Sequence, residues 1–101
     1  MHSRVNTLQT TPEAIDSVEN VTRTLVLPRI SQLPGFKGYI VLGDRSTGKA
    51  LGITLWENEE AMTKSDETAK QIRPHVEAGT GGKMESVENF EVLLARVEPL
   101  S

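Results

Sequence analysis

Residues 36–56 decide the fold, and they read FKGYIVLGDRSTGKALGITLW. Residues 36–42 and 50–56 are rich in β-branched, aliphatic and aromatic side chains, and a polar loop that contains Gly48 separates them. Two such runs joined by a short, glycine-containing polar loop are typical of an antiparallel β-hairpin. The centre of the chain is therefore predicted to be a two-stranded hairpin.

A strand and a helix are predicted to precede this hairpin. Residues 2–9 have the composition of a short strand. Pro12 suits the first position of a helix, and Glu13 favours its positive end. Apolar residues then recur at a spacing close to 3.6, and they are Ile15, Val18, Val21, Leu25 and Ile30. Pro28 is expected to kink this helix or to end its regular part.

A second helix and a final strand are predicted to follow. Asn58 can cap the helix by accepting a hydrogen bond from a free amide. Its buried stripe consists of Met62, Ser65, Ala69 and Ile72. Pro74 is expected to end the helix, because a residue before proline avoids helical geometry. Residues 77–83 then form a mobile loop, and residues 89–97 form a strand that is apolar on both faces.

The order strand, helix, strand, strand, helix, strand predicts a ferredoxin-like α+β fold. Its antiparallel four-stranded sheet carries both helices on one face, and residues 1–101 form one domain. The helices cover only one face, yet the strands 36–42 and 89–97 carry apolar residues on both faces. The other face is therefore expected to meet the sheet of a second copy, which makes the protein a homodimer.

Composition excludes several classes of function. The 11 basic and 14 acidic residues give a net charge of −3, which argues against a nucleic-acid partner. The chain has no cysteine, so it has no disulfide and no thiolate metal site. No apolar run reaches the roughly 18 residues of a membrane helix, and a cytoplasmic location is expected. His2 and His75 alone cannot form a zinc site, so no metal is predicted.

Three groups of residues resemble the antibiotic biosynthesis monooxygenase family. They are Leu33-Pro34-Gly35-Phe36-Lys37-Gly38, Ile53-Thr54-Leu55-Trp56-Glu57-Asn58-Glu59-Glu60-Ala61 and Phe90-Glu91-Val92. In that family, Pro-Gly-Phe enters the second strand and Trp-Glu ends the third. The resemblance implies a dimeric α/β barrel with a ligand pocket between sheet and helices. It implies either a cofactor-independent oxygenase of aromatic polyketides and quinols, or a haem-degrading enzyme.

The resemblance also assigns residues. Asn6 stands where oxygenases of the family carry a pocket asparagine on the first strand. Ser65 stands near a tryptophan position of the second helix, which is a departure from the family pattern. His75 lies near the place of a haem-binding histidine, but it follows Pro74. These assignments make Asn6 the catalytic candidate and Ser65 a substrate contact, and they make haem binding by His75 the least favoured reading.

Alternating residues of the third strand predict the rest of the pocket. Gly52, Thr54 and Trp56 share one face, and Gly52 would leave a hollow there. By resemblance, Asn6 and Tyr39 line the same face. The five residues predict an aromatic-lined site with polar groups for a small aromatic molecule. The alternative is that Trp56 anchors the core where the strand meets the second helix.

Two function classes follow. The first is a monooxygenase that uses no cofactor and acts with O₂ on a small aromatic, quinol-type or polyketide-like substrate. The second is a non-catalytic protein of the same fold that binds a small ligand or acts in stress, and it is favoured by the absence of an obvious general base. Arg73 could attract an acidic ligand, but we expect it to be solvated.

Overall fold

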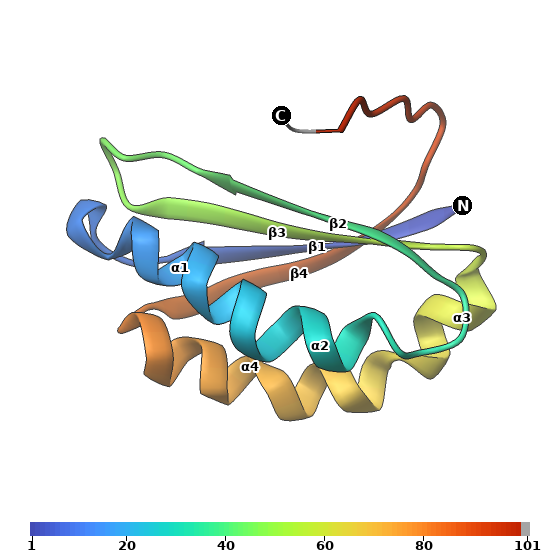
Figure 1. The fold of residues 1–101 in the computed structure, drawn as a ribbon, viewed down its shortest axis with the longest axis horizontal. Helices are drawn as coiled ribbons and strands as arrows, with labels where there is room; N and C mark the ends of the chain where they lie inside the picture. The colour runs from blue at the N-terminus through green and yellow to red at the C-terminus, as the bar shows by residue number, and fades with distance from the viewer. Residues whose placement is uncertain (100–101) are drawn as a thin grey trace.

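The computed structural model describes residues 1–99 and contains one antiparallel sheet. β1 (His2–Gln9) lies between β3 (Lys49–Trp56) and β4 (Lys83–Glu91), and β2 (Phe36–Gly43) borders β3, so the strand order is β2-β3-β1-β4. Figure 1 shows the helices on one side of this sheet. The ferredoxin-like fold predicted from the sequence is confirmed. The single domain predicted over residues 1–101 extends two residues beyond the described range.

The central hairpin is confirmed, and the structure gives its register. Tyr39 pairs with Thr54, and Val41 pairs with Gly52. Its turn is closed by the Asp44 amide, which donates to the Lys49 carbonyl at 2.8 Å. Strand alternation then places the side chains of residues 39 and 41 on the same face as those of residues 52 and 54.

The helical segment before the hairpin is continuous but irregular. A 3₁₀ turn over Pro12–Ala14 leads into α1 (Ile15–Val21), a π-helical turn covers Thr22–Val26, and α2 (Leu27–Ile30) completes the segment. Pro28 cannot donate a helical hydrogen bond, and the wider π turn lies directly before α2. The π turn thus interrupts the regular α-helix ahead of the proline, but α-helix resumes over Leu27–Ile30, so Pro28 does not end the helical segment.

The second helical segment has the predicted start and a later end. Asn58 caps α3 (Glu59–Lys64), and its side-chain oxygen accepts from the Ala61 amide at 2.8 Å. The expectation that Pro74 ends the second helix is wrong, because α4 spans Asp66–Thr80 and contains it. Pro74 leaves the carbonyl one turn earlier without a helical donor. Both positions are exposed, so water can take that bond.

The predicted mobile loop at residues 77–83 is also wrong. α4 continues to Thr80, and Gly81 ends it in the left-handed conformation with φ of +69°. The Gly81 amide donates to the Glu77 carbonyl at 2.9 Å, a frequent arrangement at helix ends. β4 begins two residues later at Lys83. The glycines therefore make a compact helix-to-strand connection.

The predicted final strand at residues 89–97 is misplaced. β4 pairs with β1 from Lys83 to Glu91, and its last pair joins Glu91 to His2. One further backbone bond joins the Val92 amide to the Met1 carbonyl at 2.9 Å, and residues 92–99 have no regular structure. Leu93 and Leu94 are 88% and 90% exposed. In Figure 1 this segment rises from the end of β4, away from the helices.

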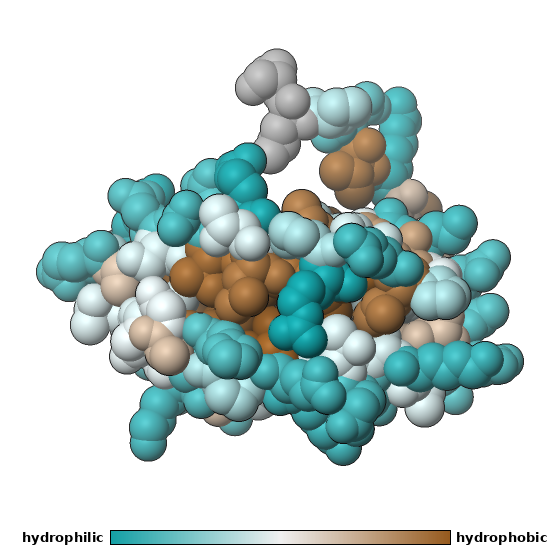
Figure 2. All heavy atoms as spheres, turned by 60° about the horizontal axis from the view of Figure 1, so that its bottom comes forward, coloured by the Kyte–Doolittle hydropathy of each residue, from teal (hydrophilic) through white to brown (hydrophobic). Residues whose placement is uncertain are grey.

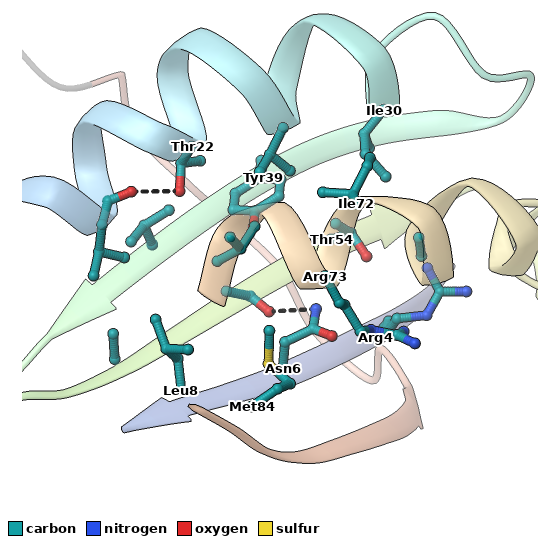
Figure 3. Close-up of a pocket in the computed structure, with 17 residues that line it drawn as sticks. Arg4, Asn6, Leu8, Thr22, Ile30, Tyr39, Thr54, Ile72, Arg73 and Met84 are labelled. Atoms are coloured by element: carbon teal, nitrogen blue, oxygen red, sulfur yellow. Dashed lines mark hydrogen bonds between the residues drawn. The ribbon is translucent and has the colours of Figure 1, made fainter. Parts of the chain in front are cut away.

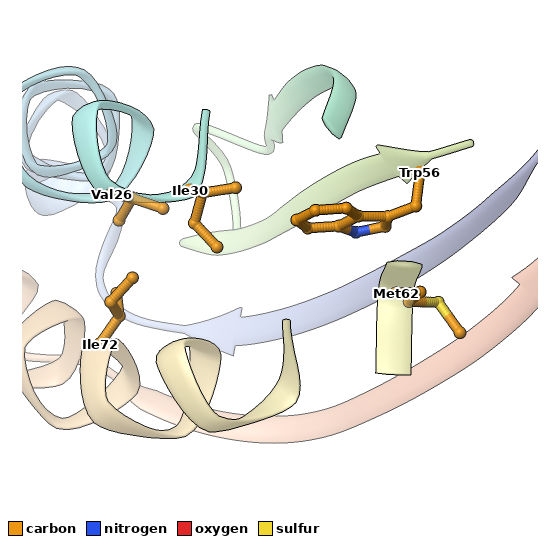
Figure 4. Close-up of a cluster of buried hydrophobic side chains, with 5 residues drawn as sticks. All are labelled: Val26, Ile30, Trp56, Met62 and Ile72. Carbon is orange, nitrogen blue, oxygen red and sulfur yellow. The ribbon is translucent and has the colours of Figure 1, made fainter. Parts of the chain in front are cut away.

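Two clusters of apolar side chains form the core between sheet and helices. The first contains Val26, Ile30, Trp56, Met62 and Ile72, which Figure 4 draws around the indole. The second contains Leu8, Ile15, Val18 and Ala50. Trp56 is fully buried and its ring meets Phe36 edge to face, with centroids 5.7 Å apart. The core is therefore divided, and the two parts flank a cavity.

None of the helices in the described part of the chain is long and apolar enough to span a bilayer.

Candidate functional site

A cavity lies between the sheet and the helices, bounded by both core clusters. Its wall is formed by side chains of all four strands, α1, the π turn, α2 and α4. About 60 Å³ of it is open to the centre of a water molecule. One buried water needs roughly 10–15 Å³ on that measure, so the cavity has room for a small organic group. Figure 2 shows apolar side chains near the middle of the helical face, divided by hydrophilic side chains and bordered by others.

Most of the wall is apolar. Its apolar members are Leu8, Val18, Val26, Ile30, Val41, Ala50, Ala69, Ile72, Val76 and Met84. The polar members are Arg4, Asn6, Thr22, Tyr39, Thr54 and Arg73. An apolar wall with a few polar groups is the usual makeup of a small-molecule site.

Asn6 lies on β1 with its amide at the floor of the cavity. Its Nδ2 donates to the Gly52 carbonyl at 3.2 Å, a bond that Figure 3 marks. Its Oδ1 is buried and accepts no hydrogen bond from residues 1–99. A buried acceptor without a donor is costly and is rare in folded proteins. Asn6 therefore offers a ligand hydroxyl or N–H a fixed acceptor.

Tyr39 and Gly52 meet across the β2–β3 pair. A Cβ placed on Gly52 would stand 2.7 Å from Tyr39 Oη, so any larger residue at position 52 would have to displace this phenol. Burial raises the pKa of Tyr39 above its ordinary value, and a hydrogen bond with Thr22 opposes the rise in part. The side chain is thus a neutral phenol at neutral pH, able to donate a hydrogen bond but not to remove a proton.

Arg4 and Arg73 form a cationic end of the same cavity. Arg4 is 2% exposed, and its Nη2 donates to the Met62 carbonyl at 2.8 Å and to Asp66. Burial lowers the pKa of Arg4, while Asp66 opposes that shift. Arg73 extends from α4, and its Nε is buried. The residue as a whole is half-buried, so the expectation that Arg73 is solvated holds only in part.

The structure brings four of the predicted site residues to the cavity. Asn6, Tyr39, Gly52 and Thr54 all line it. Thr54 has a second partner, because its hydroxyl accepts from Trp56 Nε1 at 2.8 Å. Thr54 therefore both lines the cavity and holds the indole of Trp56 in place.

Three other predicted residues lie away from this wall. Trp56 is a core side chain, as the alternative reading had it, because the indole packs against α2, α3 and α4. Ser65 is buried at the junction of α3 and α4, where its Oγ donates to the Met62 carbonyl at 2.6 Å. His75 is exposed on α4 and does not line the cavity.

Sequence reasoning missed Arg4. It stands two residues before Asn6 on the same strand, so alternation alone places both on one face. An arginine near a chain start suggests an exposed side chain, and only the position of Asp66 beneath it shows otherwise. No group of three or more His, Cys, Asp or Glu side chains gathers within residues 1–99 in a way that could hold a metal ion.

Comparisons with known proteins agree with this architecture. Residues 1–78 match the family model described as antibiotic biosynthesis monooxygenase. The uncharacterised protein Rv2557 of Mycobacterium tuberculosis (strain H37Rv) is 32% identical over 92 residues, which is 91% of this chain and 41% of that protein. The chain thus spans about two fifths of the length of the curated relatives it matches.

Solved structures share the fold. The monooxygenase from the gene ActVA-Orf6 of Streptomyces coelicolor, in complex with Nanaomycin D, has a TM-score of 0.73 at 16% identity, covering 97% of this chain and 92% of that one. SnoaB, a cofactor-independent oxygenase from Streptomyces nogalater, has a TM-score of 0.65 at 20% identity, covering 96% and 97%.

Proposed function

Because this chain belongs to the antibiotic biosynthesis monooxygenase family, we propose that it is a monooxygenase that needs no cofactor. Its substrate is a small aromatic molecule of the quinol or polyketide type, held in the cavity between sheet and helices. The observation that carries the proposal is the buried, unpartnered Asn6 Oδ1 in an otherwise apolar wall. Such an acceptor suits the hydroxyl of an aromatic substrate.

The chemistry relies on the substrate itself. Ionisation of an electron-rich phenol or quinol gives an anion that can pass an electron to O₂. The two radicals then combine to a carbon-bound peroxide, which takes up the released proton. The O–O bond breaks as the attacked carbon loses its hydrogen, so one oxygen stays on carbon as a carbonyl and the other leaves as water. The protein supplies orientation, a dry cavity and hydrogen bonds to charge that develops during the reaction.

Two side chains carry these tasks. Asn6 Oδ1 accepts from a substrate hydroxyl that stays protonated, and it fixes the ring relative to the sheet. The Tyr39 hydroxyl donates to the oxygen that gathers negative charge, because its raised pKa keeps it protonated. Neither group removes the substrate's proton, so the substrate must release that proton to bulk water before it is enclosed in the dry cavity.

Oxygen consumption tests the proposal. Purified protein in buffer with a metal chelator is mixed with quinols and polyketide-like phenols in air and under nitrogen. We expect oxygen uptake above the protein-free rate. Asn6→Ala should lower kcat about tenfold or more, and raise KM less, because misorientation costs most in the transition state. An uptake that matches the protein-free rate with every substrate refutes the enzyme.

A ligand-binding protein without turnover is the second candidate. The cavity wall contains no aspartate, glutamate or histidine among the described residues, so it offers no strong general base. Ligand binding without oxygen uptake in the same experiment would support this function.

We also propose that two copies assemble through the uncovered face of the sheet. Arg4, Asn6 and Leu8 face the cavity, so Val5 points to the other side. The register places Val5 beside Ile53, and Ile53 beside Ile40. The same face carries further apolar side chains, and they are Leu42, Leu51, Leu55 and Phe90. A contiguous apolar patch of this kind marks an interaction site.

A further inference from the structure

The cationic end of the cavity has more hydrogen-bond donors than acceptors. Arg4 uses one terminal nitrogen, Nη2, for the Met62 carbonyl and Asp66. Its other terminal nitrogen, Nη1, is buried and bonds to nothing within residues 1–99. A buried guanidinium N–H without an acceptor is costly, so this donor calls for a partner that is not part of the chain as described.

A second guanidinium faces the same place. Arg73 Nε is likewise buried and lacks an acceptor in the described chain. In Figure 3 the labelled side chains of Arg4, Asn6 and Arg73 gather at one end of the cavity, while Leu8 lies at the other. The positive charge of Arg73 also adds to the lowering of the Arg4 pKa that burial causes, which places the two groups within electrostatic reach.

The charges at this end do not balance. Two guanidinium groups face one carboxylate, that of Asp66, and this carboxylate pairs with Arg4. Arg73 forms no ion pair within 4.0 Å among the described residues. Glu77 lies one turn further along α4, but its carboxylate accepts from the Met84 amide at 2.7 Å. This end of the cavity therefore carries an excess positive charge that one further anionic group would neutralise.

We propose that the ligand of this cavity is a hydroxylated aromatic carboxylic acid whose carboxylate lies between Arg4 and Arg73. Two N–H donors from two different elements, β1 and α4, suit the two oxygens of one carboxylate. The aromatic body then occupies the apolar remainder, and its hydroxyl donates to Asn6 Oδ1. The inference rests on the proposed function only in treating this cavity as the substrate's site.

A matched pair of probes tests it. Benzoate and benzamide have nearly the same size and shape and differ in charge, and their affinities are measured by calorimetry. We expect benzoate to bind about ten- to a hundredfold more tightly, as hydrogen bonds to charged groups allow. Arg73→Gln should remove this preference and leave the affinity for benzamide within about twofold.

The control is Arg29→Gln, which removes an exposed arginine from α2 that does not line the cavity. It should keep the full preference for benzoate. Arg4 is left unchanged, because its loss would strip the Met62 carbonyl and Asp66 of their donor. Circular dichroism of both variants shows whether they keep the fold.

Three results would overturn the inference: equal affinity for the two probes, a benzoate preference that survives Arg73→Gln, or no binding of either probe at millimolar concentration. The outcome is separable from that of the proposed function. Oxygen uptake with neutral quinols but without a preference for benzoate would refute the carboxylate site and leave the proposed enzyme standing. A preference for benzoate without oxygen uptake from any substrate would refute the proposed enzymatic activity and leave the carboxylate site standing.

Discussion

The phenol oxygen of Tyr39 lies over Gly52, where a Cβ would stand only 2.7 Å away. The two residues lie on neighbouring strands and are diagonal neighbours, because Gly52 pairs with Val41 and Tyr39 stands two residues before Val41. The missing side chain at position 52 is what admits the tyrosine hydroxyl to the cavity. The hollow predicted at Gly52 thus exists in the sheet, and a neighbouring residue occupies it.

Gly52→Ala should destabilise the protein by about 1–3 kcal/mol, because the new methyl group overlaps the phenol. In a Tyr39→Phe background the cost should fall below about 1 kcal/mol, because the next atom of the ring is 3.5 Å from the Cβ, an ordinary contact. Urea unfolding of the wild type, the two single variants and the double variant gives the coupling energy between the two positions. Equal costs in both backgrounds would mean that the hydroxyl does not occupy this space.

The ionisation of Tyr39 can be followed directly, since it is the only tyrosine in the chain. The pKa of Tyr39 is raised in the folded state, so the folded protein holds its proton to higher pH than the unfolded chain. The contribution of Tyr39 to the free energy of unfolding should be fully present below about pH 10. It should be lost as the pH rises from there through the folded-state pKa, by at most about 1.4 kcal/mol per pH unit.

Ultraviolet absorbance of tyrosinate should show a midpoint above pH 10 in buffer and near 10 in denaturant. Tyr39→Phe should lack the corresponding loss of stability at alkaline pH. A folded-state midpoint at or below that of the denatured chain would contradict the burial of the phenol.

Thr54→Val should cost about 1–3 kcal/mol, because it leaves Trp56 Nε1 without an acceptor inside the core. Thr63→Val is the matched control on the exposed side of α3, and it should stay within about 0.5 kcal/mol of the wild type. Thermal or urea unfolding measures both. If the two variants unfold alike, the threonine–indole bond adds nothing to stability.

Much of the fold follows from local patterns. The hairpin, β1 and the Asn58 cap depend on residues close in sequence, and all three were predictable. The end of α4 was not, because whether Pro74 stops a helix depends on whether its lost bond faces water. The limits of β4 were not either, because they depend on the length of β1, its partner.

The candidate site was predictable where strand alternation alone decides the face. Gly52 and Thr54 meet that condition, whereas Asn6 was assigned to the pocket by the family resemblance. Trp56 lies on the same face but at the strand's end, beneath α3 and outside the cavity. Alternation also places Arg4 on this face, but its burial depends on its distant partner Asp66, which lies 62 residues away in the chain.

The proposed dimer predicts a mass of twice the monomer by light scattering at micromolar concentration. Ile53→Arg places an unpaired charge on the centre of the uncovered sheet face, and it should shift the protein toward monomer. Ala78→Arg adds the same charge to the exposed surface of α4 and should leave the mass unchanged. A monomeric wild type would contradict the assembly.

Transfer of an oxygen atom from O₂ to the bound substrate is the central claim, and isotopic labelling tests it most directly. The protein is incubated with quinols and polyketide-like phenols under dioxygen labelled with a heavy oxygen isotope, and the masses of the products are measured by mass spectrometry. The account predicts one labelled oxygen atom per product molecule, formed faster than without protein and far more slowly with Asn6→Ala. Product that carries no label beyond the protein-free control would contradict it.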